Sequence, residues 1–502
     1  MKKVYSEKGL NLRKNGILMH ISSLPGKQGI GTMGKSAYKF VDFLHESLQS
    51  YWQILPICPT SYGDSPYQSY STFAGNPYFI DLDMLCDMGL LEACDYVDID
   101  YEAEEDNVNY GALYRLRYPV LKKAAANFNT KDASYNAFLA ANKDWIDSYA
   151  LFMSLKDYHQ GRSWWEWEEA YRYAYTNEIE TFKEEHKGEL EFWKIIQYLF
   201  FKQWVKLKSY ANSKGISIIG DLPIYVSLDS VDVWSDSKQF QLDDKRMPKE
   251  VSGCPPDGFS KVGQLWGNPL FDWEYIEKDG FSYWLKKISY LCKIYDVLRI
   301  DHFRGFDSYY AIPYGSKDAT KGVWKPGPGM KLFNKVNEVI GKPRIIVEDL
   351  GFLTDSVKKL LKDSGFPGMK VIEMGFDSRD PNSKEYLPHN IIHKSVAYTG
   401  SHDNDTIKGW FETAAKEDIE FAKKYMHIRD EQDISWDVIA VLMQSSAMLT
   451  IVQAQDLLEL GGSARMNTPS TIGGNWTWRA KEDMSEVISK RLKEYTLMYE
   501  RA

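Results

Sequence analysis

The feature that most constrains the fold is a series of eight short apolar runs, each ending in polar residues, glycine or proline. They are GILMHISS (16–23), YWQILPI (51–57), ISIIGDLPIYV (216–226), VLRIDHF (297–303), RIIVEDLG (344–351), MKVIEMGF (369–376), SVAYTGSHDND (395–405) and MLTIVQAQDLL (448–458). Runs of this length and composition are typical of strands buried on both faces of a parallel sheet. Eight of them, separated by helical segments, predict an α/β fold of the (β/α)8 TIM barrel class.

The spacing of the runs predicts one barrel with two insertions. From the fourth run onward the spacing leaves room for a crossover helix each time. Residues 84–205 carry apolar residues at helical spacing, which predicts a helical insertion after strand 2. Residues 227–285 contain many Pro, Gly and Trp residues, which predicts a loop-rich insertion after strand 3. We therefore expect residues 1–502 to form a single catalytic barrel.

Charge and composition exclude several classes of partner. The net charge is −9 and no block of Lys or Arg stands out, so we expect neither nucleic acid nor an anionic membrane as a partner. The first residues are charged, and no apolar stretch is long enough to span a membrane, which predicts a cytoplasmic protein. The five cysteines include no C-x-x-C pair, so neither a disulfide framework nor a zinc site is expected. The 14% of aromatic residues fit either a large core or platforms for sugar rings.

Acidic residues close four of the predicted strands. Asp221, Asp301, Glu348 with its neighbour Asp349, and Asp403 all lie at such ends. One acid at a strand end is usually a helix cap or a turn former. Acids on four strands are different, because the C-terminal ends of barrel strands meet at one rim, where active sites lie. The pattern therefore predicts a site built on carboxylates.

Two of these acids are expected to differ in protonation. Arg299 and Asp301 are two apart in a strand, so their side chains should point the same way, and the arginine would keep the carboxylate ionised, as a nucleophile requires. Adjacent Glu348 and Asp349 cannot both point inward, and the residues alone do not say which does. Whichever faces the cluster should have a raised pKa and act as a general acid. Such a pair is typical of retaining glycoside chemistry.

Metal binding is the rival use of these acids. Oxygen-rich clusters bind Mg²⁺ or Ca²⁺, but the spacing D-x-D-x-D-G is absent and Arg299 and Arg304 would oppose a cation. We therefore predict no metal and no cofactor. His302 and His402 each adjoin an acid, and either could be a structural residue or a hydrogen-bond donor to a sugar hydroxyl.

Seven motifs, in order along the chain, resemble one known family. They are GDSPYQSYSTFAGNPYFIDLD (63–83), IIGDLPIYV (218–226), PPDGFSKVGQLWGNPLFDW (255–273), RIDHFRG (299–305), VEDLG (347–351), GSHDNDT (400–406) and RMNTPSTIGGNWTWR (465–479). Together they resemble the 4-α-glucanotransferases of glycoside hydrolase family 77, known as amylomaltases or disproportionating enzymes. The match extends from about residue 16 to the end of the chain.

The resemblance implies a retaining enzyme on a barrel related to that of the α-amylases. Such an enzyme moves α-1,4-linked glucan segments from a donor to the 4-OH of an acceptor, which is glucose or a maltooligosaccharide. By position in the motifs, Asp301 matches the family's nucleophile, Glu348 its acid/base and Asp403 its transition-state stabiliser. The resemblance thus selects Glu348 over Asp349.

The resemblance also implies a set of substrate-binding residues. Arg299, His402 and Asp221 match positions that line the donor sugar site, and Tyr67 matches one that stacks against the sugar. Trp266 and Phe259 lie in a motif similar to a loop that covers the cleft. The last motif supplies Arg465, Asn467 and Asn475, which are either structural or polar groups at the edge of the substrate.

Two other functions stay open at this stage. A plain α-glucan hydrolase would use the same first step, and a glucan-binding protein without turnover would keep the aromatic residues. Incubation with maltotriose separates the three, because only a transferase yields glucose together with longer oligomers.

Overall fold

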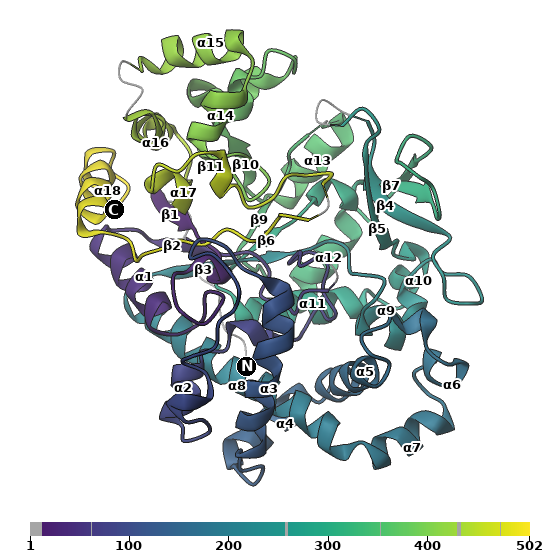
Figure 1. The fold of residues 1–502 in the computed structure, drawn as a ribbon. Coiled ribbons are helices and arrows are strands. Elements are labelled where there is room, and N and C mark those ends of the chain that lie inside the picture. The colour runs from purple at the N-terminus through teal and green to yellow at the C-terminus, as the bar shows by residue number, and fades with distance from the viewer. Residues whose placement is uncertain (1–12, 62, 257–259, 352, 429–432, 472) are drawn as a thin grey trace.

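An eight-stranded parallel sheet forms the centre of the molecule, with helices around it (Figure 1). The computed structural model describes residues 13–61, 63–256, 260–351, 353–428, 433–471 and 473–502. The strands are β1 (Lys14–Leu18), β2 (Tyr51–Gln53), β3 (Ser217–Leu222), β6 (Val297–Ile300), β9 (Ile345–Val347), β10 (Gly368–Val371), β11 (Ser395–Tyr398) and β12 (Leu449–Gln453). Each of the eight predicted runs overlaps one of them, although β1 and β10 begin two residues and one residue before their runs.

The order of the strands is that of a barrel. It runs β10-β11-β12-β1-β2-β3-β6-β9, with every pair parallel. At the remaining junction Val347 N donates to Pro367 O at 3.0 Å, which brings β9 to the start of β10. The predicted (β/α)8 barrel is therefore confirmed.

Helices connect most of these strands and cover the outside of the barrel. They are α1 (Lys35–Glu46), α8 (Lys187–Ser213), α11 (Ser282–Ile294), α12 (Met330–Val339), α13 (Asp355–Ser364), α14 (Ile407–Thr413), α15 (Lys416–Met426), α16 (Ile434–Gln444), α17 (Ala454–Leu457) and α18 (Glu486–Met498). The last helix, yellow in Figure 1, packs beside the first, purple helix α1.

The segment between β2 and β3 is largely helical. Before α8 it contains α2 (Leu82–Asp87), α3 (Tyr110–Ala126), α4 (Ala133–Asn142), α5 (Ile146–Tyr158), α6 (Glu169–Arg172) and α7 (Asn177–Glu185). Local capping explains where several begin: Asn109, Asp132 and Thr176 accept hydrogen bonds from backbone N–H groups in the first turns of α3, α4 and α7. Helix α8 packs against α5 and α3.

A second, antiparallel sheet lies beside the barrel and was not predicted. Its strands, in the order β5-β4-β7-β8, are β4 (Glu250–Cys254), β5 (Gln264–Pro269), β7 (Ser308–Pro313) and β8 (Val323–Pro326). Helices α9 (Val231–Ser235) and α10 (Trp273–Lys278) belong to the same part of the chain. Residues 227–285, expected to be rich in loops, thus contribute two strands and two complete helices as well.

Short 3-10 helices complete the structure. They are η2 (Ile21–Ser23), η3 (Pro77–Phe79), η4 (Ala93–Asp95), η5 (Trp164–Glu166), η6 (Ser237–Gln239), η7 (Phe303–Phe306), η8 (Ile372–Phe376), η9 (Ser383–Tyr386), η10 (Pro388–Asn390) and η12 (Gly462–Ala464). None of the helices in the described part of the chain combines the length and apolar character that a membrane span needs.

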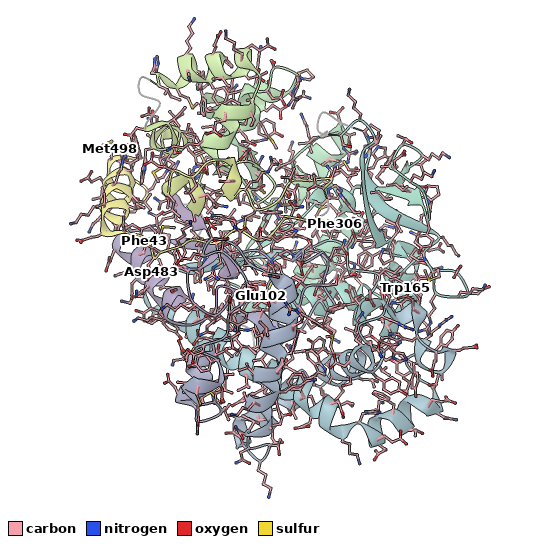
Figure 2. All side chains as sticks on the ribbon, in the orientation of Figure 1. Phe43, Glu102, Trp165, Phe306, Asp483 and Met498 are labelled. Atoms are coloured by element: carbon pink, nitrogen blue, oxygen red, sulfur yellow. The ribbon has the colours of Figure 1, made fainter. Side chains whose placement is uncertain are left out.

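Most of the aromatic content serves the core. Side chains fill the space between the strands and the helices (Figure 2). Phe306, labelled there, is fully buried and contacts the rings of Trp273, Trp284 and Phe333. Eight tryptophans are less than 2% exposed: Trp52, Trp164, Trp167, Trp193, Trp204, Trp234, Trp284 and Trp436. Half of the 16 tryptophans are therefore enclosed in the core and cannot contact a ligand.

Candidate active site

Four strands bring acidic side chains to one end of the barrel. Asp221 is the penultimate residue of β3, Asp301 follows β6, Glu348 follows β9, and Asp403 lies five residues after β11. Strands β3, β6 and β9 are neighbours in the sheet, and all strands are parallel, so their C-terminal ends lie at the same rim.

Arg299 joins three of these acids. Its Nη1 lies 2.6 Å from Asp221 Oδ2 and 3.2 Å from Asp301 Oδ1, and its Nη2 lies 3.0 Å from Glu348 Oε2. The guanidinium is 2% exposed, so these bonds form away from solvent. Arg299 and Asp301 point the same way, as strand alternation predicts. The three carboxylates are thus within reach of one planar cation.

The side chains of Glu348 and Asp349 point to opposite sides, as expected for neighbours in an extended segment. Glu348 Oε2 accepts hydrogen bonds from Arg299 and, at 2.9 Å, from His302 N. Asp349 turns to the other side, where it is 2% exposed and accepts a 2.5 Å bond from Met369 N on β10. The inward residue, which the sequence pattern alone left open, is therefore Glu348.

Protonation in the Asp301–Glu348 pair is the reverse of what we expected. The two side chains are hydrogen-bonded to each other. Burial, and then the adjacent Glu348 carboxylate, raise the pKa of Asp301 well above its usual value. Burial also raises the pKa of Glu348, but Arg299 and the N–H of His302 outweigh it and lower the net value. Arg299 therefore favours the ionised form of Glu348, whereas burial favours the protonated form of Asp301.

Asp403 has a separate set of partners. His402 Nε2 lies 3.2 Å from its Oδ2, and Asn467 Nδ2 donates to its Oδ1 at 2.6 Å. Arg465 Nη2 donates to its backbone oxygen at 2.5 Å. Burial raises the pKa of Asp403, but His402 and the Asn467 amide outweigh it and lower the net pKa. Arg465 and Asn467, for which two roles were open, thus hold Asp403 in place.

Tyr67 and His402 form a stacked aromatic pair next to the acids. Their ring centroids are 4.8 Å apart at an interplanar angle of 21°. Tyr67 donates its hydroxyl to Asp221 Oδ2 at 2.7 Å, which connects this pair to Arg299. Trp476 extends the stack, with centroids 5.8 Å from Tyr67 and 5.7 Å from His402. Trp476 was not predicted, although it lies within the quoted motif GGNWTWR.

The remaining predicted residues differ in position. Trp266 on β5 contacts the His302 ring edge to face, with centroids 4.8 Å apart. The backbone N–H of His302 donates to Glu348, so His302 lies between Trp266 and Glu348 in space.

His302 has a left-handed backbone conformation (φ 47°), which presents its N–H to Glu348. Burial lowers the pKa of the His302 side chain to about 4. Asn475 closes a turn by bonding Thr468 N and Thr471. Phe259 lies outside the described residues.

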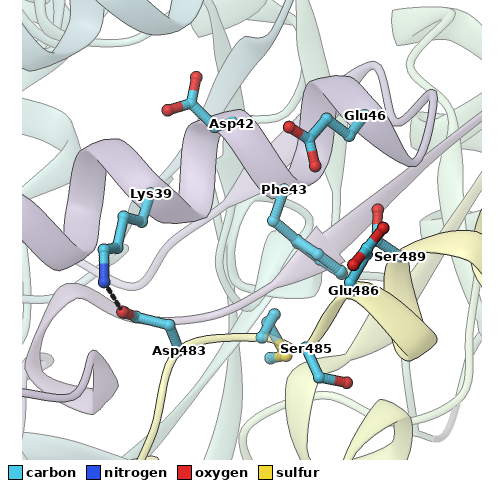
Figure 3. Close-up of a pocket in the computed structure, with 9 residues that line it drawn as sticks. Lys39, Asp42, Phe43, Glu46, Asp483, Ser485, Glu486 and Ser489 are labelled. Atoms are coloured by element: carbon cyan, nitrogen blue, oxygen red, sulfur yellow. Dashed lines mark hydrogen bonds and ion pairs between the residues drawn. The ribbon is translucent and has the colours of Figure 1, made fainter.

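A pocket elsewhere in the molecule is unrelated to these acids. It lies between α1 and the start of α18 and has a volume of about 310 Å³ (Figure 3). An ion pair between Lys39 and Asp483, at 2.5 Å, crosses one end. None of the predicted site residues lines it. Within the described residues, no group of three or more His, Cys, Asp or Glu side chains is arranged to hold a metal ion.

Comparison with known proteins gives consistent matches over nearly the whole chain. Residues 19–485 match the family described as 4-alpha-glucanotransferase. A 4-alpha-glucanotransferase of Clostridium butyricum is 50% identical over 96% of this chain and 100% of its own length. One from Streptococcus pneumoniae is 45% identical, covering 97% of each chain. The solved amylomaltase of Streptococcus agalactiae in complex with acarbose is 42% identical, with a TM-score of 0.94 over 98% of this chain and 100% of that one. The chain therefore belongs to the 4-α-glucanotransferase family, glycoside hydrolase family 77.

Proposed function

We propose that the chain transfers α-1,4-linked glucan segments to the 4-OH of glucose or a maltooligosaccharide by a retaining mechanism. Asp301 is the nucleophile, Glu348 the acid/base, and Asp403 binds hydroxyls of the reacting sugar. Family membership supports the reaction. The single observation that best supports these roles is the contact of Arg299 with both Asp301 and Glu348, which places a carboxylate pair at one point of the rim.

In the first step, an oxygen of Asp301 forms a bond with C1 of the donor sugar while the bond from C1 to the departing oxygen breaks. Glu348 gives its proton to that oxygen. This step requires an ionised Asp301 and a protonated Glu348, which is the reverse of the protonation that the free site favours. Two carboxyl groups in a retaining site stand about 5 Å apart. Entry of the sugar therefore replaces the Asp301–Glu348 hydrogen bond.

In the second step, the acceptor 4-OH attacks C1 and the bond from C1 to Asp301 breaks. The Glu348 carboxylate takes the hydroxyl proton, which restores the starting state. Transfer requires that a sugar reach C1 before water does. Trp266, beside His302 and Glu348, is placed to cover that side of the intermediate.

Several further parts of the proposal concern the setting of the reaction. Arg299, Asp221, His402 and Tyr67 bind the donor sugar, and Trp266, Phe259 and Asn475 also take part in substrate binding. The substrates are α-1,4-glucans and maltooligosaccharides, without a metal or cofactor, in the cytoplasm. Residues 1–502 form one catalytic barrel, with 84–205 and 227–285 as insertions.

Incubation with maltotriose tests the reaction. We expect glucose together with maltotetraose and longer oligomers, resolved by chromatography. Glucose and maltose alone would identify a hydrolase, and binding without products would identify a glucan-binding protein.

Variants of the same protein test the residue roles. Asp301→Asn and Glu348→Gln should each lower kcat by at least about a thousandfold. Asp349→Asn is the matched control, because this neighbouring acid points toward β10, and it should retain activity. Equal losses in Glu348→Gln and Asp349→Asn would contradict the assignment of Glu348.

A further inference from the structure

The loop that carries Asp403 is held from two sides. On one side Arg465 and Asn467 bind Asp403 itself. On the other side the loop forms a tight turn, in which Asn404 Oδ1 accepts bonds from Ser401 N at 2.9 Å and Ser401 Oγ at 2.8 Å. Asn404 N in turn donates to Ser401 O at 3.1 Å. Ser401 and Asn404 are 4% and 7% exposed, so the turn is a buried structure.

Glu373 fixes the orientation of the amide at the centre of this turn. It lies in η8, directly after β10, and β10 is the neighbour of β11 in the barrel. Asn404 donates a hydrogen bond from Nδ2 to Glu373 Oε1. Because an amide has one oxygen and one nitrogen, an acceptor at Nδ2 forces Oδ1 to face Ser401. We propose that Glu373 is a positioning residue, which holds the Ser401–Asp405 turn in the conformation that presents Asp403 to the substrate.

The protonation state in which Glu373 accepts this hydrogen bond depends on its burial and on the charged groups around it. Asp405, Asp456 and Arg465 are the charged groups that act on it. Burial raises the pKa of Glu373 to about 8, although the Asn404 amide and Arg465 oppose the shift. At neutral pH Glu373 therefore accepts the bond as an uncharged group. Glutamine, which has the same shape and an oxygen acceptor, should replace it.

The inference rests on the proposed function, because only there does Asp403 bind the reacting sugar. If Asp403 acts mainly in the transition state, a displaced turn should lower kcat and leave KM nearly unchanged. Displacement of a reacting group by about 1 Å costs up to roughly 100-fold in rate.

The test compares two substitutions at one position, with maltotriose as substrate. Glu373→Met removes the acceptor while keeping the size of the side chain, and we expect kcat to fall roughly 10- to 100-fold. Glu373→Gln should stay within about twofold of the wild type, because it restores the hydrogen bond. A Glu373→Met enzyme with wild-type kcat, or a Glu373→Gln enzyme as slow as Glu373→Met, would overturn the proposal.

Further variants separate positioning from general damage. Asn404→Ala removes the same hydrogen bond from the other partner, so the test stays open if Glu373→Met does not fold. The double variant should be no slower than Asn404→Ala alone, since Asn404→Ala already breaks the contact with Glu373. A clearly larger loss in the double variant would overturn the proposal. Glu385→Met is the control: this exposed acid pairs with the surface residue Lys358 at 3.0 Å, and its replacement should leave kcat unchanged.

The proposed function is tested separately in the same assay. Asp403→Asn should be nearly inactive if Asp403 binds the reacting sugar. An active Asp403→Asn enzyme would reject the role of Asp403, whereas an inactive one together with an unaffected Glu373→Met enzyme would reject only the role of Glu373.

Discussion

Arg299 is the residue on which the geometry of the site depends most, because one guanidinium serves Asp221, Asp301 and Glu348. Its planar shape lets separate N–H groups reach separate carboxylates, which a lysine ammonium cannot do in the same positions. The buried carboxylate of Asp221, with no exposed side-chain surface, depends on this cation for its charge compensation.

Replacement of Arg299 by Lys should therefore lower both activity and stability. We expect kcat/KM for maltotriose to fall by at least about 100-fold and the melting temperature to decrease. Arg491→Lys is a matched control, since Arg491 pairs with Asp433 at 2.6 Å on the surface. An Arg299→Lys enzyme that matches Arg491→Lys in both measurements would contradict this reading.

Asp349 gives a prediction for the pH dependence of stability. Burial raises the pKa of Asp349 from 3.8 to about 6. Between about pH 4 and pH 6 the folded state keeps a proton that the unfolded chain releases, so this contribution to stability is lost as the pH rises through 6. Asp349→Asn keeps an acceptor for Met369 N and does not titrate. Its melting temperature, relative to the wild type, should rise from pH 4 to pH 6 and then stay constant. A difference that does not change with pH would refute the prediction.

At the residue scale, the sequence predicted side chains whose role follows from local order. Arg299 and Asp301 share a direction because they are two apart in one strand. Trp476 and Glu373 were missed for the opposite reason: their contacts, with Tyr67 and Asn404, join distant parts of the chain. Nothing in the local pattern distinguishes such residues from ordinary core or surface residues.

At the element scale, the barrel strands were predictable and the second sheet was not. A strand buried on both faces is apolar along its length, and this signal is independent of its neighbours. Strands β5 (QLWGNP) and β8 (VWKP) contain Gly, Pro and polar residues and lie at the edges of their sheet, where such residues are tolerated. Their composition therefore resembles that of loops.

Strand β5 carries Trp266, and this gives a prediction about product distribution. Trp266→Ala should increase the share of hydrolysis relative to transfer, because water gains access beside His302 and Glu348. The ratio of net reducing ends formed to oligomers longer than maltotriose measures this share. Trp165→Ala, at a partly exposed tryptophan in η5, is the control. An unchanged ratio in Trp266→Ala would count against a covering role.

At the scale of the whole molecule, the two ends of the described chain are joined at the base of the barrel. Arg501 is fully buried, and its guanidinium donates to the backbone oxygens of Met443, Ser445, Ala447 and Lys14 at 2.7 to 3.1 Å. Burial lowers the pKa of Arg501 to about 9. These contacts hold the starts of β1 and β12 in place, at the end of the barrel opposite to the acidic residues.

Arg501→Met should destabilise the fold without changing the chemistry. The backbone oxygens of Lys14 and Ala447 lose this donor, whereas those of Met443 and Ser445 keep hydrogen bonds from Arg13. Each buried group left unsatisfied costs roughly 1 kcal/mol or more. We expect the melting temperature to fall by several degrees while kcat at 25 °C stays the same. A large loss of kcat at a temperature where the variant is fully folded would contradict the claim that Arg501 affects stability alone.

The pairing of β1 with β12 also has a consequence for how the protein is made. Residues Lys14–Leu18 lie against Leu449–Gln453, so a ribosome must add more than 400 residues before β1 meets its second neighbour. At about 5–20 residues per second this takes roughly 20 to 90 s. During that time one border of β1 has free peptide groups that can pair with other nascent chains. Fusion of a slow-folding partner to the C-terminus should leave the yield of soluble protein unchanged. Premature termination before residue 449 should instead yield insoluble fragments.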